Sequence, residues 1–274
     1  MSDTRRIGLV AVRQEILPLL DAFQAIKKDR RGDVILYEGQ RGQHMVVLAE
    51  VPPGPVSAAL GAQILILHYS VDSLVSVGSA GAVHAQLSPG DLVISQCAVA
   101  HDVGVFLGSR FEPSGVMGRD ERGRVGYHRV FEADSDLLSL ALDAARSFEV
   151  PVYVGMVVTG SQAVCSTARK RWLCQTFQAL AVEMETAAVA QVATAYRLPW
   201  VSIRAISDAA GDELVLDYKR LRVYLDDERP AWQQALGRWL YLATHPAAWW
   251  RVRRLRRGLA QASRQAAKVV DTMF

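Results

Sequence analysis

The sequence predicts an α/β fold with a C-terminal helical extension. Short apolar runs rich in β-branched residues alternate with stretches whose apolar residues recur at helical spacing, which is typical of buried strands joined by helices. A chain of 274 residues is long enough for one sizeable core. Its content of 50% hydrophobic and 22% charged residues is that of an ordinary globular protein.

Each element follows from the spacing of its apolar residues and from the turn residues around it. Pro18 is compatible with the first helix because it falls in the first turn. The expected strands are 7–12, 34–40, 45–51, 73–77, 92–98, 152–159, 179–184 and 199–206. The expected helices are 15–26, 54–67, 137–148, 166–177, 185–196, 232–245 and 252–269.

Two segments rich in small residues are predicted to lie outside these elements. Residues 78–81 are predicted to form a turn after the fourth strand. Residues 101–128 hold six glycines and many charges, and they are predicted to form a long loop with at most short strands. Long loops in compact domains are often lids or contact surfaces.

Charge divides the chain into two parts. Residues 232–274 carry eight Arg or Lys residues and one acid, so the first 231 residues have a net charge of −4. We therefore expect a body at 1–231 and a basic helical extension at 232–274. The extension has a narrow apolar stripe made of Val252, Leu255, Leu259, Ala262, Ala266 and Val269.

The stripe favours packing of the extension on the body or on a second subunit. The alternative is contact with a membrane surface through Trp249 and Trp250, which stand beside several arginines. Binding of nucleic acid is not expected, because the basic tail has no accompanying motif or aromatic platform.

Nothing in the composition indicates a metal site, a cofactor or a secretory segment. Cys97, Cys165 and Cys174 form no C-x-x-C pair and have no zinc-ligand spacing with histidines. The apolar run at 7–10 is too short for a signal-peptide core. We expect a cytoplasmic protein with reduced thiols, no metal ion and no cofactor.

Polar side chains follow several of the expected strands at the point where each strand ends. They are Glu15, Ser79, Glu185 and Asp208. In an open α/β sheet the carboxyl ends of strands are where ligands bind, so three carboxylates and a hydroxyl are expected in one crevice. The alternative is that each of the four is only a helix cap or a first-turn acid.

Four segments in a fixed order carry a family resemblance. They are 77–83 (VGSAGAV), 90–95 (GDLVIS), 182–188 (VEMETAA) and 203–208 (IRAISD). The set resembles the nucleoside phosphorylase superfamily, and most of all its 5′-methylthioadenosine/S-adenosylhomocysteine nucleosidases, over roughly residues 6–210. The resemblance implies a three-layer αβα fold with a central mixed β-sheet. It also implies hydrolysis of the N-glycosidic bond of a purine nucleoside with release of adenine.

The resemblance implies two catalytic residues. Asp208 matches the acid that protonates the purine at N7, and Glu15 matches the acid that activates water. Glycosidic cleavage passes through an oxocarbenium-like state, so a departing base needs a proton and a nucleophile needs a base. One site would then hold two carboxylates with opposite protonation needs.

The resemblance also implies a set of substrate-binding residues. Glu185 and Met184 match the floor under the ribose, Ser207 would orient the acid, and the backbone of Val164 would contact the purine edge. The whole implied set is Ser79, Ala80, Gly81, Val164, Met184, Glu185 and Ser207. By the same resemblance we expect a homodimer that binds a small purine nucleoside.

One departure from the family bears on the substrate. Ala163 stands where the nucleosidases place an aromatic ring over the purine. Either Phe106 or Trp172 covers the base, or the preferred base differs.

Other functions stay open. A purine nucleoside phosphorylase, or a phosphorylase of an adenosyl lipid as in hopanoid synthesis, would need cations for phosphate, and Arg13 and Arg204 are the arginines nearest the motifs. A nucleoside-sensing protein without catalysis is a further alternative, because fold alone does not give function.

Overall fold

The computed structural model describes residues 4–23, 27–119, 123–213, 232–233, 235, 239 and 246–274. Its centre is a ten-stranded mixed sheet. The strands are β1 (Arg6–Val12), β2 (Lys27–Arg31), β3 (Val34–Arg41), β4 (His44–Val51), β5 (Ser73–Ala82), β6 (Leu92–Ala100), β11 (Phe131–Glu132), β12 (Val152–Thr159), β13 (Ala181–Glu183) and β14 (Trp200–Asp208).

Part of this sheet closes on itself. The strand order is β11-β6-β12-β13-β5-β1-β4-β3-β2, and β14 pairs with both β5 and β6. Strands β5, β14, β6, β12 and β13 therefore form a ring, and both parallel and antiparallel pairs occur in it. The predicted mixed central sheet is confirmed.

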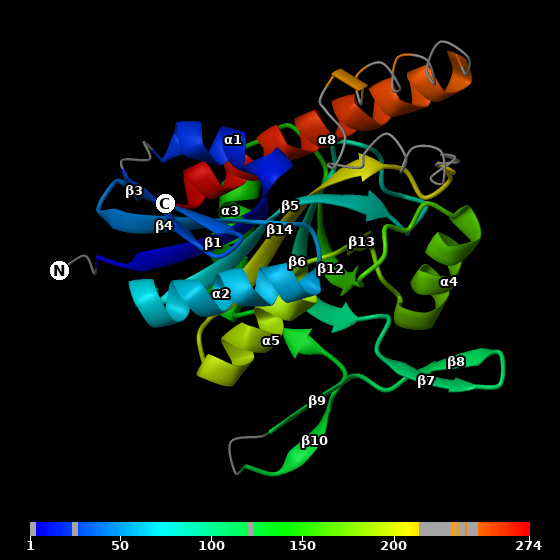
Figure 1. Ribbon diagram of the computed structural model, residues 1–274, viewed down its shortest axis with the longest axis horizontal. Coiled ribbons are helices and arrows are strands. Elements are labelled where there is room, and N and C mark those ends of the chain that lie inside the picture. Colours follow the sequence, from blue (N-terminus) through cyan, green and yellow to red (C-terminus); the bar gives the residue numbers. More distant parts are fainter. Residues whose placement is uncertain are drawn as a thin grey trace.

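Helices cover both faces of the sheet. They are α1 (Arg13–Ala22), α2 (Pro55–Tyr69), α3 (Ser135–Arg146), α4 (Thr167–Phe177), α5 (Thr186–Tyr196) and α8 (Pro246–Met273). One apolar cluster joins α1, α3 and α8 to the sheet, and another joins α2 and α5 to it. Figure 1 shows α1 and α8 on one face of the sheet and α2 and α5 on the other, so the three predicted layers are present.

The predicted turn at 78–81 is wrong, because these residues continue β5 to Ala82. Gly78, Ser79 and Ala80 pair with β14, and Gly81 pairs with β13. Small side chains are typical of turns, but they are also needed where a strand lies very close to other groups. A Cβ atom at Gly78 would meet Glu15, and one at Gly81 would meet Asp208.

The segment 101–128 is more ordered than the predicted loop. It forms two hairpins, β7 (Gly104–Leu107) with β8 (Arg110–Pro113) and β9 (Val116–Arg119) with β10 (Val125–His128). Figure 1 shows both hairpins extending away from the sheet. Strand β2 was not predicted, because its five charged residues carry no apolar alternation. It lies at the sheet edge, where charged side chains are common.

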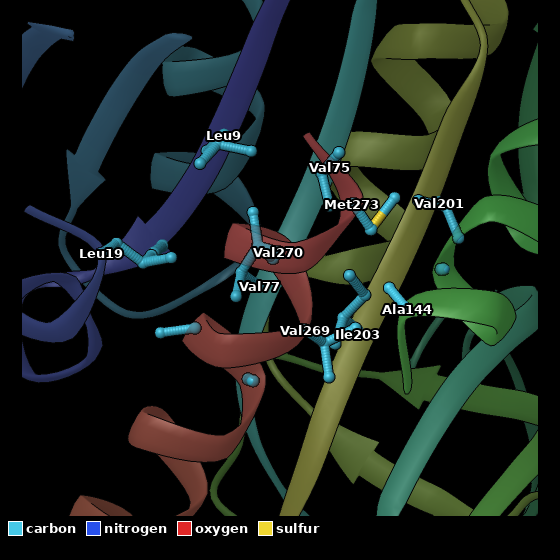
Figure 2. Packing of buried hydrophobic residues seen from close by; sticks show 14 of the residues in the cluster. Leu9, Leu19, Val75, Val77, Ala144, Val201, Ile203, Val269, Val270 and Met273 are labelled. Atoms are coloured by element: carbon cyan, nitrogen blue, oxygen red, sulfur yellow. The ribbon is translucent and has the colours of Figure 1, made fainter. Parts of the chain in front are cut away.

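The end of the chain packs into the core. Val269, Val270 and Met273 of α8 lie among Leu9, Leu19, Val75 and Val77 of the body and other residues that Figure 2 labels. Ala262, Ala266 and Val269 of the predicted stripe are completely buried. Arg41 and Asp271 form an ion pair of 2.9 Å that fixes the helix end to β3.

Residues 246–252 and 254–256 of α8 are described by their backbone alone. The predicted boundary at residue 231 lies outside the described residues, as do residues 120–122 and most of 232–245. Membrane contact by Trp249 and Trp250 stays a prediction. Among the helices in the described part of the chain, none is long and apolar enough to cross a membrane.

Candidate active site

Glu15 is held against β5 at the carboxyl end of β1. Helix α1 follows β1 directly, so the first helical turn places Glu15 beside the neighbouring strand. Its Oε1 accepts hydrogen bonds from the backbone N–H of Ser79 at 2.6 Å and from the Ser79 hydroxyl at 2.5 Å. Its Oε2 is buried and accepts no hydrogen bond from the described residues. One oxygen is therefore anchored, and the other has unused capacity to accept a hydrogen bond.

Burial sets the base strength of Glu15. It raises the pKa of this carboxyl, while the Arg204 guanidinium and the Ser79 hydrogen bonds partly oppose the rise. A carboxylate with a raised pKa is a stronger base than an ordinary glutamate. Glu15 is therefore suited to remove a proton from water.

Arg204 on β14 is a buried cation among acids. It is 1% exposed, its Nη2 lies 2.6 Å from Glu183 Oε2, and its Nη1 lies 3.6 Å from Glu185 Oε2. A Cβ atom at Gly78 would overlap both the Glu15 carboxylate and the Arg204 guanidinium. Glycine at this position therefore allows the acid and the cation to share one space.

Glu185 stands just before α5, where β13 ends. Its Oε1 accepts a hydrogen bond of 3.0 Å from the backbone N–H of Gly54. Burial, followed by the charge of Glu183, raises the pKa of Glu185 to about 7, and Arg204 opposes this rise. Glu185 can therefore change its charge near neutral pH.

Glu183 holds the backbone at the start of α5, next to Glu185. Its Oε2 accepts from the backbone N–H groups of Glu185 and Thr186, both at 2.9 Å. Its Oε1 accepts from the Thr159 hydroxyl at 2.5 Å. With these bonds and the Arg204 ion pair, Glu183 has more partners than Glu185, which has one hydrogen bond from Gly54 and one longer ion pair with Arg204.

Asp208 ends β14 at an irregular point of the strand. The pairing with β5 shifts between Ile206 and Asp208, so Asp208 stands opposite Gly81. Such bulges re-aim side chains near functional sites. Asp208 Oδ1 accepts from the Ser207 hydroxyl at 2.6 Å, and Oδ2 accepts from Lys170 Nζ at 2.5 Å.

Strand β5 connects the two ends of the site. Ser79 contacts Glu15, and a Cβ atom at Gly81 would lie 3.1 Å from Asp208 Oδ2. Residues two apart on a strand face the same side and are roughly 7 Å apart. Glu15 and Asp208 therefore both lie against the last residues of β5, and Glu185 is joined to this group through Arg204.

The other expected binding residues differ in burial and in their contacts. Ala80 is buried, its carbonyl oxygen 3.2 Å from the Ser207 hydroxyl. Met184 and Val164 are partly buried, and Ala163 beside Val164 is exposed. Trp172 is in contact with other aromatic rings and with Arg169, whose guanidinium lies 3.9 Å from its ring centre.

Two residues of this site were not singled out from the sequence. Glu183 belongs to the same VEME segment as Glu185, and two acids so close together were the available signal. Lys170 stands between Arg169 and Arg171 on α4, and no local pattern indicates which of three cations is buried. Arg204 was considered only as a phosphate ligand.

Known proteins are similar to this chain in sequence and in fold. The model of the family described as Phosphorylase superfamily matches residues 6–224. The 5′-methylthioadenosine/S-adenosylhomocysteine nucleosidase of Bacillus thuringiensis is 35% identical over 212 residues, which are 76% of this chain and 87% of that protein. A nucleosidase of the same description from Bacillus anthracis matches to the same extent.

The structural similarity to solved proteins covers almost the whole chain. The nucleosidase of Neisseria meningitidis in complex with methylthio-immucillin-A has a TM-score of 0.74 and 27% identity, covering 98% of each chain. Futalosine hydrolase of Helicobacter pylori has a TM-score of 0.72 at 23% identity, covering 98% of this chain and 97% of that one, which shows a shared fold. The chain belongs to the phosphorylase superfamily, and it is an enzyme of the nucleosidase type.

Proposed function

We propose that this chain hydrolyses the N-glycosidic bond of an adenine nucleoside, such as 5′-methylthioadenosine or S-adenosylhomocysteine, and releases adenine. Relatives named for these two substrates are 35% identical to it. The observation that carries the proposal is the position of Glu15. Its carboxylate takes both the N–H and the hydroxyl of Ser79, the groups that an anionic phosphate would otherwise use.

The arginines give phosphate little support. Arg13 has a side chain that is 86% exposed and lies 3.8 Å from Glu50. Arg204 already forms ion pairs with Glu183 and Glu185, and its charge also acts on Glu15. A second anion beside Glu15 would be repelled, which favours water over phosphate as the nucleophile.

Each residue has a role in the proposed reaction. Glu15 takes a proton from water as the water attacks C1′. Glu185 accepts hydrogen bonds from the ribose hydroxyls, and its negative charge stabilises the positive charge that develops on the sugar. Asp208, oriented by Ser207, delivers a proton to N7 so that adenine leaves as a neutral base.

The remaining residues hold the substrate. Met184 lies under the ribose beside Glu185, and the Val164 backbone contacts the purine edge. Ser79, Ala80 and Gly81 line the side from which water attacks. Because Ala163 offers no ring, a ring over the adenine would have to come from another residue, such as Phe106 or Trp172.

The test is adenine release in buffer without phosphate. Purified protein is incubated with methylthioadenosine or S-adenosylhomocysteine, and free adenine is measured by chromatography. We expect release without phosphate and no ribose 1-phosphate product. Release that appears only after phosphate is added would establish a phosphorylase, and tight binding with no release would establish a nucleoside sensor.

Activity is expected to fall as the pH drops below about 7. Glu185, with a pKa of about 7, and Glu15, whose pKa is also raised, must both be ionised. A raised pKa means that protonation begins at a higher pH, so activity is present above this range and lost below it. Loss of one essential charge lowers kcat/KM roughly tenfold per pH unit. The kcat/KM is measured from pH 5 to 9 at constant ionic strength, and a flat profile between pH 5 and 7 would contradict the assignment.

We also propose that the chain forms a homodimer through its hairpins. Phe106 is 73% exposed and Leu107 is 65% exposed on β7, and Tyr127 is 62% exposed on β10. Clustered exposed apolar side chains mark interaction surfaces. Sedimentation that finds only monomer at micromolar concentration would reject this assembly.

A further inference from the structure

Lys170 is a buried lysine that faces the proposed acid. It is completely buried on α4, and its Nζ bonds Asp208 Oδ2 at 2.5 Å, the Ala209 carbonyl at 2.8 Å and the Asp212 carbonyl at 3.4 Å. An ammonium has three protons, and three acceptors meet them here. The surroundings are therefore built for the charged form of Lys170.

A buried ammonium needs a countercharge, and Asp208 supplies it. Isolated charges are very costly to bury, whereas a paired and hydrogen-bonded charge can be accommodated. The carboxylate of nearby Asp212 accepts at Oδ2 from the Ala209 N–H at 3.1 Å. Lys170 and Asp208 thus form one ion pair inside the site.

This pairing changes where the transferred proton resides. Asp208 accepts at Oδ1 from Ser207 and at Oδ2 from Lys170. The neighbours of Asp208 thus donate to both of its oxygens, an arrangement that suits the acceptor-only carboxylate form. Of these two donors, Lys170 Nζ is the ionisable one that can pass a proton to Asp208.

We propose that Lys170 is a positioning residue that loads Asp208 with the proton delivered to the purine. The proposal rests on the hydrolytic function proposed above. As the C1′–N9 bond breaks, its electron pair moves into the purine, and N7 takes a proton from Asp208. Lys170 Nζ passes a proton to Asp208 Oδ2 and becomes a neutral amine. Glu15 holds the proton from the attacking water, and exchange with solvent restores both groups after adenine leaves.

Two further titratable residues lie near the pair, Cys165 and Asp212. Burial, and then the charge of Asp208, raises the pKa of Cys165, so it stays a neutral thiol near pH 7. Asp212 contacts Lys170 through its carbonyl oxygen. A change in the pH profile on altering Lys170 therefore reports on the Lys170–Asp208 pair.

A role limited to holding the turn 209–212 makes different predictions from a proton-loading role. If Lys170 only holds the turn, its replacement changes stability and KM but leaves the shape of the pH profile unchanged. If it loads Asp208, its removal leaves Asp208 to take protons from solvent. As the pH is raised, the activity of the variant then begins to decline at a lower pH than the activity of the wild type.

The experiment compares the wild type with Lys170→Met, Lys170→Arg and Lys170→Ala, and uses Arg171→Met as the control. Arg171 is exposed on the same helix. The kcat and KM for adenine release are measured from pH 5.5 to 9.5, and adenine binding and thermal unfolding report the integrity of each variant. We expect Lys170→Met to lose about 10²-fold in kcat with a KM within about threefold, while Arg171→Met matches the wild type.

Two further readouts separate proton loading from charge alone. Arg keeps its protons in proteins, so Lys170→Arg should retain adenine binding and still have a low kcat. Added ethylamine should restore part of the kcat of Lys170→Ala, and amines of different basicity should restore it to different extents. Restoration of kcat by Arg, or a Met variant with the wild-type pH profile, would overturn the proposal even if Lys170→Ala fails to fold.

Failure of the function itself gives a separate result. Wild-type protein that releases no adenine in phosphate-free buffer rejects hydrolysis and the proton-loading role together. Wild-type protein that does release adenine, with Lys170→Met equally active, rejects only the role of Lys170.

Discussion

Replacement of Asp208 by Asn is expected to lower kcat for adenine release about 10²- to 10⁴-fold. The amide cannot carry the proton that N7 takes when the glycosidic bond breaks, so adenine must leave as an anion. The amide oxygen can still accept from Ser207 at the Oδ1 position, which keeps the side chain in place. KM should therefore change much less than kcat.

The same substitution has a second effect, on stability. It removes the carboxylate that pairs with the buried Lys170 ammonium, which costs about 3 kcal/mol of unfolding free energy. The double variant Asp208→Asn with Lys170→Met removes both charges and should regain part of this stability without regaining activity. Thermal unfolding and adenine release are measured on both variants.

The control for this prediction is Asp143→Asn. Asp143 lies on α3 and pairs with Arg146 on the surface, where ion pairs contribute little. It should match the wild type in both assays. An Asp208→Asn variant that is folded and keeps a tenth or more of the wild-type kcat would remove Asp208 from the mechanism.

Replacement of Glu15 by Gln is expected to lower kcat by a similar factor, about 10²- to 10⁴-fold. A glutamine amide cannot take the proton of the attacking water. Its oxygen can still accept the two hydrogen bonds that Ser79 donates, so the shape of the site is preserved. Adenine binding should stay close to that of the wild type.

The distinguishing measurements are single-turnover adenine release and adenine affinity. Glu38→Gln is the matched control, because Glu38 forms an ion pair with Lys27 at the sheet edge. A Glu15→Gln variant with wild-type kcat would mean that another group activates water. Loss of adenine affinity together with kcat would indicate that Glu15 acts in binding rather than in catalysis.

Much of the fold could be predicted from local patterns, because strong apolar periodicity and its interruptions lie in the sequence itself. The strand 152–159 was predicted with its observed bounds, and helix α4 differs by one residue at its start. The strand at 78–82 could not be predicted, because its small residues are required by the close approach of side chains from α1 and β14. Contacts between distant segments leave no local pattern.

The same limit applies to the site. Glu15, Ser79, Glu185 and Asp208 were found because polar residues after buried strands are conspicuous, and Glu15 and Ser79 do contact each other. Their catalytic roles stay predictions. Lys170 could not be found, because only the tertiary structure shows which of three adjacent cations on α4 is buried.

Helix α8 couples the packing of the core to the support of the proposed acid. Its Gly258 lies against the backbone of Ser207, next to the proposed acid, and Val269, Val270 and Met273 fill the core beside β1 and β5. Loss of these apolar side chains should therefore open the core and at the same time loosen the helix that backs Ser207.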